Sequence, residues 1–187
     1  RLENPDVVRA LPGLSRLSFP RGLSQETLSE QRSVFWRRDL CLELDLETGV
    51  AGKTLERRDG EAFVGWLRKG DLLVSQKTKS LEILQRQDGA TIHSIPIPDS
   101  RLRFATVGDG ESTVVSPDGA LAASFMVESS TGGLSLALCD LRQRKWVSKI
   151  PFDRITVSAM RFSPDGAMLL LGHADGTSTL WDTARMR

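Results

Sequence analysis

The sequence predicts an all-β protein built from about four consecutive four-stranded antiparallel units. The first observation is a near-repeat, in which Val115–Ala120 (VSPDGA) recurs as Phe162–Ala167 (FSPDGA). The second is a short strand-like segment that ends in aspartate after each copy, Leu136–Asp140 and Ser178–Asp182. The third is that no segment has a convincing helical period. Self-similarity at a spacing of a few tens of residues indicates stacked supersecondary units.

The strand that ends in aspartate also divides the first half of the chain. The corresponding positions of the four units are Asp45, Gln85, Asp140 and Asp182. They give units at approximately 14–61, 62–100, 101–151 and 152–187. Residues 1–13 hold a lone outer strand, Asp6–Leu11, and a lead-in.

The last unit shows the strands most clearly. It contains predicted strands at Thr156–Ser163, Ala167–His173 and Thr177–Asp182. Tight turns at Pro164–Gly166 and Asp175-Gly176 join them, because Pro presets φ and Gly accepts positive φ. Fourth strands are predicted at Val50–Leu55, Thr91–Ile97 and Trp146–Pro151, and insertions at Asp99–Gly110 and Glu128–Gly133. Gln25–Arg32 has good helix formers and is interpreted as an insertion with one helical turn.

Near-continuous apolar runs predict strands that are covered on both faces. These runs are Leu72–Val74, Leu121–Val127, Leu134–Cys139 and Met168–Leu171. Cys41 and Cys139 fall in different units, so we expect both thiols to be unbridged and Cys139 to be buried. Trp66 and Trp181 lie in strands, and we expect them in the core.

The residues around these turns resemble the WD-repeat (tryptophan–aspartate repeat) β-propeller family. Arg161–Gly166 and Leu169–Asp182 match its repeat, with Ser163–Gly166, Asp175-Gly176 and Trp181-Asp182 at the expected relative positions. In the third unit Cys139 takes the place of the Trp, and in the first two units Leu44 and Leu84 do. The resemblance covers most of 14–185 and implies a β-propeller, or a propeller fragment, of about four blades.

Two closures remain open under this resemblance. Family propellers usually have about seven blades, so the chain is either the tail of a larger propeller or a four-bladed ring. In the ring, Asp6–Leu11 serves as the outer strand of the last blade. The hydrogen-bonded chain of His, Ser/Thr, Asp and Trp found in many family repeats is not expected here, because Leu171 stands at the hydroxyl position.

Composition excludes several classes of protein. The chain has 187 residues, 40% hydrophobic and 26% charged, with a formal net charge of +1, which indicates a globular protein and argues against nucleic-acid binding. No apolar run is long enough to span a bilayer. Two cysteines do not make a disulfide scaffold, so we expect a cytoplasmic protein. The chain opens with Arg1 rather than Met, which leaves open a lost signal peptide or upstream domain.

Nothing in the sequence predicts catalysis. His173 and Asp175 could form a base oriented by a carboxylate, but Asp-Gly is a hairpin signal and a turn is the better interpretation. His93 falls in an outer strand. No Cys/His cluster has metal-ligand spacing and no glycine loop lies between a strand and a helix. We therefore expect no enzyme activity, no metal and no cofactor.

Basic residues in the loops predict a binding surface. Turns after second and fourth strands converge on one end of stacked antiparallel units, and that end carries the candidate partner-binding residues Arg37, Arg38, Lys77, Lys79, Arg101 and Arg103, with Trp36 as an aromatic anchor. Such a surface suits an acidic or phosphorylated segment of another protein. The competing interpretation is ordinary solvated loop charge, interleaved with Asp99, Glu111 and Glu128.

Two functions fit these features. The first is a non-catalytic scaffold that binds other proteins on a propeller face. The alternative is an accessory or regulatory domain of a larger enzyme, kinase- or peptidase-like, whose catalytic part lies upstream.

Overall fold

The computed structural model describes residues 24–29, 32–37, 40–45, 51–56, 61–67, 72–85, 87–105, 112–152 and 157–186. All regular structure in these ranges is β-strand, which confirms the all-β prediction. Within the same ranges, no helix has the length and apolar character needed to cross a membrane.

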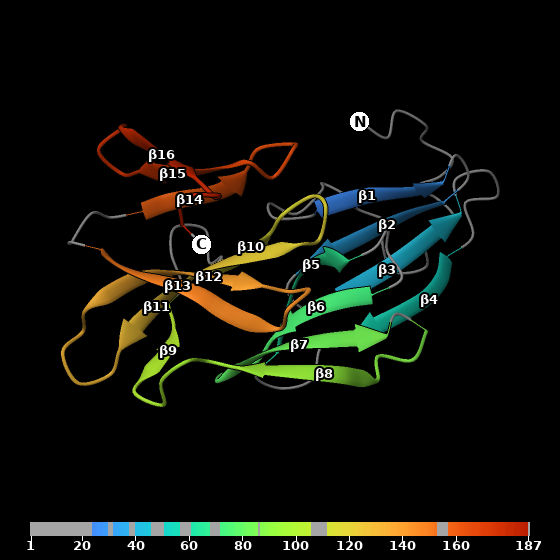
Figure 1. The fold of residues 1–187 in the computed structure, drawn as a ribbon. Coiled ribbons are helices and arrows are strands. Elements are labelled where there is room, and N and C mark those ends of the chain that lie inside the picture. Colours follow the sequence, from blue (N-terminus) through green and yellow to red (C-terminus); the bar gives the residue numbers. More distant parts are fainter. Residues whose placement is uncertain are drawn as a thin grey trace.

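Sixteen strands are described, and they form consecutive antiparallel sheets (Figure 1). The first sheet has the order β1-β2-β3-β4, made of β1 (Ser24–Ser29), β2 (Arg32–Arg37), β3 (Leu40–Asp45) and β4 (Ala51–Glu56). The second has the order β5-β6-β7-β8, made of β5 (Ala62–Leu67), β6 (Leu72–Gln76), β7 (Ser80–Gln85) and β8 (Thr91–Pro96).

The third and fourth sheets complete the described part of the chain. The third has the order β10-β11-β12-β13, made of β10 (Thr113–Val115), β11 (Leu121–Glu128), β12 (Leu134–Asp140) and β13 (Lys145–Phe152), with β9 (Leu102–Phe104) also paired to β11. The fourth has three strands, β14 (Val157–Phe162), β15 (Met168–His173) and β16 (Ser178–Asp182). Within each sheet, neighbouring strands follow each other in the chain, apart from β9, which pairs with β11.

The sequence-based interpretation of Gln25–Arg32 is wrong, because Ser24–Ser29 is strand β1. It pairs antiparallel with β2 in a register that sets Ser24 opposite Trp36 and Thr27 opposite Ser33. Pairing with a neighbouring strand supplies the backbone hydrogen bonds that a lone helical turn lacks, so tertiary context overrides local propensity.

The first strand of the third sheet is split in two. β9 pairs with the far end of β11, where Met126 lies opposite Phe104, and β10 pairs with its middle, where Ser124 lies opposite Thr113. The predicted insertion Asp99–Gly110 therefore contains a strand of its own. Residues 106–111 lie outside the described part.

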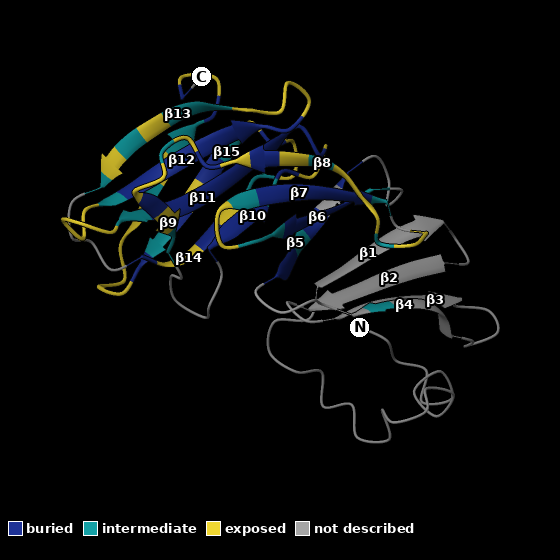
Figure 2. Ribbon diagram, turned by 90° about the horizontal axis from the view of Figure 1, so that it is seen from below, coloured by how far each residue is buried: buried dark blue, intermediate teal, exposed yellow. Residues whose placement is uncertain are grey.

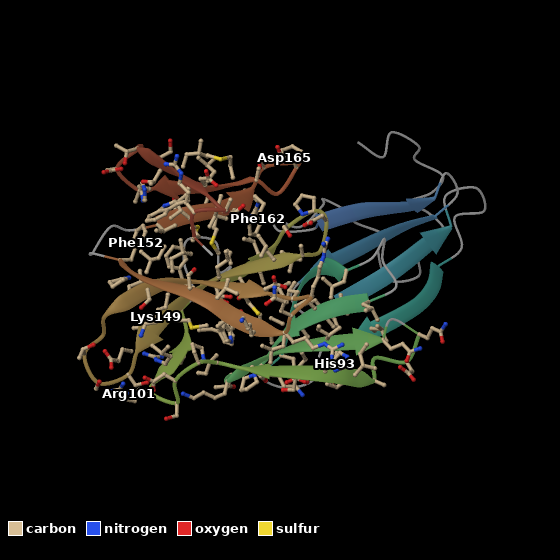
Figure 3. The ribbon with its side chains drawn as sticks, viewed as in Figure 1. His93, Arg101, Lys149, Phe152, Phe162 and Asp165 are labelled. Carbon is tan, nitrogen blue, oxygen red and sulfur yellow. The ribbon has the colours of Figure 1, made fainter. Side chains whose placement is uncertain are left out.

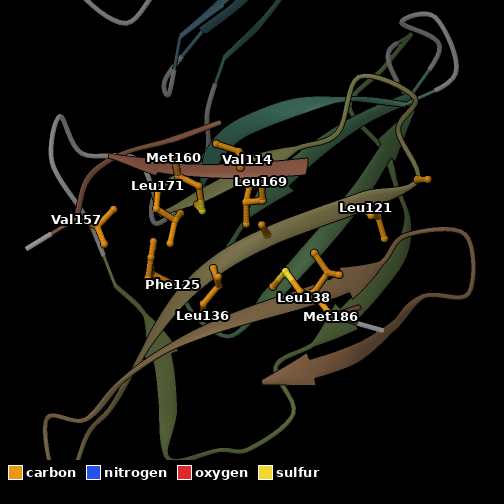
Figure 4. Close-up of a cluster of buried hydrophobic side chains, with 12 residues drawn as sticks. Val114, Leu121, Phe125, Leu136, Leu138, Val157, Met160, Leu169, Leu171 and Met186 are labelled. Atoms are coloured by element: carbon orange, nitrogen blue, oxygen red, sulfur yellow. The ribbon is translucent and has the colours of Figure 1, made fainter. Parts of the chain in front are cut away.

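The main core lies between the third and fourth sheets (Figure 4). One face of the third sheet supplies Phe125, Leu136 and Leu138, and the fourth sheet supplies Leu169 and Leu171; all five are fully buried. These are alternate residues along each strand, as a sheet that buries one face against a neighbour requires.

The opposite face of the third sheet packs on the second sheet. Ala122 and Cys139 lie opposite each other in the β11–β12 ladder and contact a cluster that contains Val74, Leu81 and Ile83. Both faces of β11 are therefore buried, and Leu121–Met126 is uniformly dark in Figure 2. This explains why the sequence of β11 is apolar throughout rather than alternating.

Polar contacts also join the second and third sheets. Gln76 Oε1 accepts hydrogen bonds from Ser112 Oγ and Thr113 Oγ1, each at 2.6 Å. On the outer side, Trp146 Nε1 donates to the carbonyl of Pro96 at 2.8 Å. Hydrogen bonds thus supplement apolar packing between these two sheets.

The outer face of the fourth sheet is open in the described structure. Leu170 of β15 lies opposite Leu180 of β16, and they are 44% and 59% exposed. The expectation that Met168–Leu171 is covered on both faces is therefore wrong at Leu170, because no described sheet lies against that side.

The predicted turns occur where the glycines allow them. Gly119, Gly166 and Gly176 have φ of 65°, 71° and 85°, in the left-handed region that favours glycine. Asp118 and Asp165 brace the first two turns, since each accepts hydrogen bonds from the serine two residues before it and from the backbone N–H two residues after it. These hydrogen bonds, together with the positive φ of the glycine, explain the repeated Ser-Pro-Asp-Gly-Ala sequence.

Cys139 is buried and unbridged, as expected. Cys41 lies in β3, but its side chain is outside the described part, as is that of Trp66. Trp181 is half-buried and packs against the main core, so its place at the core is at the edge rather than the centre.

Candidate functional site

The predicted binding residues that the structure describes lie at one end of the sheets. Lys77 and Lys79 lie in the turn between β6 and β7, Arg101 lies in the connection from β8 to β9, and Arg103 is the middle residue of β9. Trp36 and Arg37 are the last two residues of β2. Their side chains, and Arg38 altogether, lie outside the described residues.

Lys79 joins the two described connections to each other. Its Nζ donates hydrogen bonds to the carbonyl oxygens of Ser100, at 2.8 Å, and Leu102, at 2.5 Å. The backbone adds a bond from Ile97 N to the carbonyl of Lys79 at 2.9 Å. The β6–β7 turn and the 99–102 segment therefore form one continuous surface.

Arg101 is already paired with carboxylates. Its guanidinium contacts Asp99 at 2.7 Å and Glu128 at 3.7 Å. The hydrogen bond from Arg101 lowers the pKa of Asp99 to about 2, and the positive charge of Lys149 on β13 adds to the effect. Asp99 is thus ionised at neutral pH and neutralises much of the Arg101 charge.

Lys77 is likewise paired, with Glu61 Oε1 at 3.2 Å. Among the described residues, Lys79, Arg103 and Lys149 make no ion pair with a carboxylate, and all three are exposed. We call Lys77, Lys79, Arg101, Arg103 and Lys149 the cationic rim; Figure 3 shows Arg101 and Lys149 on this side of the molecule. Charge for an incoming anion comes mainly from Lys79, Arg103 and Lys149.

His173 and Asp175 do not form an acid–base pair. His173 is buried, its Nε2 is hydrogen-bonded to Thr179 Oγ1 at 2.8 Å, and its ring stacks on Phe152. Asp175 instead accepts bonds from the backbone and side chain of Thr177, and these lower its pKa. The turn interpretation therefore describes this pair better than the catalytic one. In the part of the chain that the structure describes, no group of His, Cys, Asp and Glu could hold a metal ion.

A groove of about 560 Å³ lies at the opposite end, between the second and third sheets. It is lined by Leu67, Leu72, Ile83, Ile92, His93, Asp118, Gly119, Leu141, Arg142 and Arg144. Sequence reasoning did not find this groove. Its lining comes from strand ends and turns of two units, so no single segment carries a signal for it.

Comparison with known proteins gives no further assignment. The chain matches no protein-family model, and no curated protein sequence matches it. The resemblance to WD repeats therefore rests on the turn and strand-end residues themselves.

Proposed function

We propose that this protein is a non-catalytic scaffold that binds other proteins, with its sheets arranged as blades of a β-propeller. The main observation behind the proposal is that the Lys79 side chain, in the β6–β7 turn, hydrogen-bonds the segment that leads from β8 into β9. These two hydrogen bonds hold cationic side chains from the second and third sheets on one fixed surface. Rigid presentation lowers the entropy cost of binding.

The stacked sheets supply the rigidity. β10 contacts both β5 and β14, so the first strands of three successive sheets lie side by side. Shared cores on both faces of the third sheet hold them together. This arrangement is the reason for proposing blades, and the WD-repeat resemblance of the turns points the same way.

An acidic or phosphorylated segment suits the cationic rim. Arg103 and Lys149 are exposed and have no described carboxylate partner, so they are available for charge-assisted hydrogen bonds. Arg101 and Lys77 are held by Asp99 and Glu61, and they contribute shape more than net charge.

The test is binding of fluorescein-labelled acidic and phosphoserine peptides, measured by anisotropy at low and moderate salt. Arg103→Glu combined with Lys149→Glu should weaken binding about tenfold or more, since each loses a charge-assisted contact. Arg185→Glu is the matched control, because Arg185 is 88% exposed and lies in the fourth sheet's final turn. Absence of binding, or binding that neither salt nor the double reversal changes, rejects the rim as the site.

A further inference from the structure

We propose that the groove between the second and third sheets is a second binding site, for a short peptide segment that carries a carboxylate beside a bulky apolar side chain. It lies at the end of the sheets opposite the cationic rim and does not depend on it. The lining combines an apolar floor with an arginine edge, and each part selects one half of such a ligand.

The floor of the groove is apolar and belongs to both sheets. Leu67 and Leu72 lie opposite each other where β5 and β6 meet, and Ile83 of β7 continues the surface. Leu141, which follows β12, closes it from the third sheet. Leu67, Ile83 and Leu141 are each largely buried, so the floor of the groove is made of packed side chains.

A β-bulge in β8 brings two successive side chains to the groove. Ile83 lies opposite His93 and Leu84 opposite Thr91, which leaves Ile92 as the extra residue. In a regular strand only one of two neighbours faces a given side, whereas here both Ile92 and His93 line the groove. Ile92 is 43% exposed, one of few large apolar side chains so open in the described structure. An apolar group in the groove covers it.

The polar edge comes from the turns of the third sheet. Arg142 pairs with Asp118 at 3.2 Å, and Asp118 also accepts bonds from Ser116 Oγ and Ala120 N. The carboxylate of Asp118 is therefore held by its own turn and by Arg142 of the β12–β13 turn. Arg144, with φ of 57°, lines the groove and has no carboxylate partner among the described residues. Its guanidinium is the group that an incoming carboxylate meets.

These turns are held in place without a ligand. Gln143 N donates to Asp140 Oδ1 at 2.8 Å, and Gly119 N donates to the carbonyl of Ser116 at 2.8 Å. Because its walls are already ordered, the site loses little conformational entropy when it binds a ligand. The volume falls within the range of about 300–1,000 Å³ that small-ligand pockets span, enough for one large side chain and its neighbour.

The experiment uses a displayed library of short random peptides, selected on the full chain. The enriched peptides should carry Asp or Glu next to Leu, Ile or Phe. Affinity of a selected peptide, measured by anisotropy, should fall about tenfold or more in Arg144→Glu and several-fold in Ile92→Ser. Arg144→Lys should keep most of the affinity, and Arg103→Glu, at the cationic rim, should leave it unchanged.

Three outcomes overturn the proposal. One is that selection on the wild-type chain enriches peptides no more than selection on the Arg144→Glu, Ile92→Ser double variant. Another is selected peptides that are basic or that bind the double variant equally well. The third is a dimer in sedimentation that these substitutions dissociate, which assigns the groove to a second copy of the chain. Loss of rim binding in Arg103→Glu with groove binding intact separates this proposal from the scaffold proposal.

Discussion

At the scale of single residues, burial sets the chemistry of Cys139. The side chain is fully buried between the second and third sheets. Desolvation, with a smaller contribution from the charge of Asp140, raises the pKa of the thiol from 9.0 to about 12. The thiolate is the reactive form of cysteine. Cys139 is inaccessible to reagents and stays protonated at neutral pH, so we expect it to be unreactive.

We therefore expect Cys139 to resist a thiol reagent at pH 8 in the native protein and to react fully in denaturant. The folded pKa lies above the unfolded one, so the stability that the protonated thiol contributes is complete below about pH 9 and is lost as pH rises toward 12. The Cys41→Ser variant isolates the signal of Cys139. Rapid labelling of that variant under native conditions would contradict the packing of the third sheet on the second.

Trp181 poses a different problem at the same scale. Its ring lies 6.4 Å from that of Phe152 at the edge of the main core. Its Nε1 is buried and has no hydrogen-bond partner among the described residues. The ring therefore stabilises the fold through packing while its N–H costs free energy. Leu171 stands at the position where the WD-repeat resemblance places a hydroxyl partner.

Replacing Trp181 separates these two contributions. Trp181→Ala should lower the free energy of unfolding by about 3 kcal/mol, because it leaves a cavity beside Phe152. Trp181→Phe keeps a ring and removes the orphan donor, so its loss should be about 1 kcal/mol or less. Urea unfolding measures both. Equal losses in the two variants would mean that the indole N–H is satisfied.

At the scale of elements, β15 shows what covers each side of the last sheet. Leu171 faces the third sheet and is fully buried, whereas its neighbour Leu170 faces outward and is 44% exposed. Successive residues of a strand point to opposite faces, so two adjacent leucines report on two different environments.

The pair gives a matched experiment. Leu171→Ala should cost about 2–5 kcal/mol in unfolding free energy, and Leu170→Ala less than about 1 kcal/mol. Chemical denaturation of both variants under the same conditions is the measurement. If Leu170→Ala proves as costly as Leu171→Ala, the outer face of the fourth sheet is covered in solution.

Local signals explain which elements the sequence could predict. Ser-Pro-Asp-Gly fixes a turn through the φ of Pro and Gly and the carboxylate of Asp, and the strands beside Gly119 and Gly166 follow from it. Strands β1 and β9 escaped prediction because pairing with β2 and β11, rather than their own sequences, makes them strands. The exposure of Leu170 depends on what lies beside the sheet, which no local pattern encodes.

The candidate sites divide in the same way. The alternation of strand direction predicts that Lys79 and Arg103 lie in loops at one end of the sheets; in the structure Lys79 lies in the β6–β7 turn, whereas Arg103 lies within strand β9. Pairing of Lys77 with Glu61 and of Arg101 with Glu128 joins residues from separate segments of the chain, so sequence alone did not show how much of the charge is neutralised. The groove was missed for the same reason, since the two units that form it meet only in the fold.

At the scale of the whole molecule, the stacking of sheets depends on close approach between first strands. Gly65 of β5 lies against Val115 of β10, and a Cβ at Gly65 would lie 2.6 Å from Val115 Cβ. That distance is far inside van der Waals contact, so only glycine fits without a shift of one sheet. This close approach at Gly65 couples the second sheet to the third, and β10 of the third sheet also contacts β14 of the fourth.

Gly65→Ala should therefore destabilise the protein by about 1–3 kcal/mol through overpacking between sheets. Combining it with Val115→Ala should recover much of the loss, because the smaller side chain makes room for the new methyl group. Gly172→Ala is the control, since a Cβ there meets Ala159 at an ordinary 3.6 Å. Thermal unfolding of the two single variants and the double variant gives the coupling energy between positions 65 and 115. Additive effects of the two substitutions would show that these sheets do not stack through β5 and β10, and would remove the main support for a blade-like arrangement.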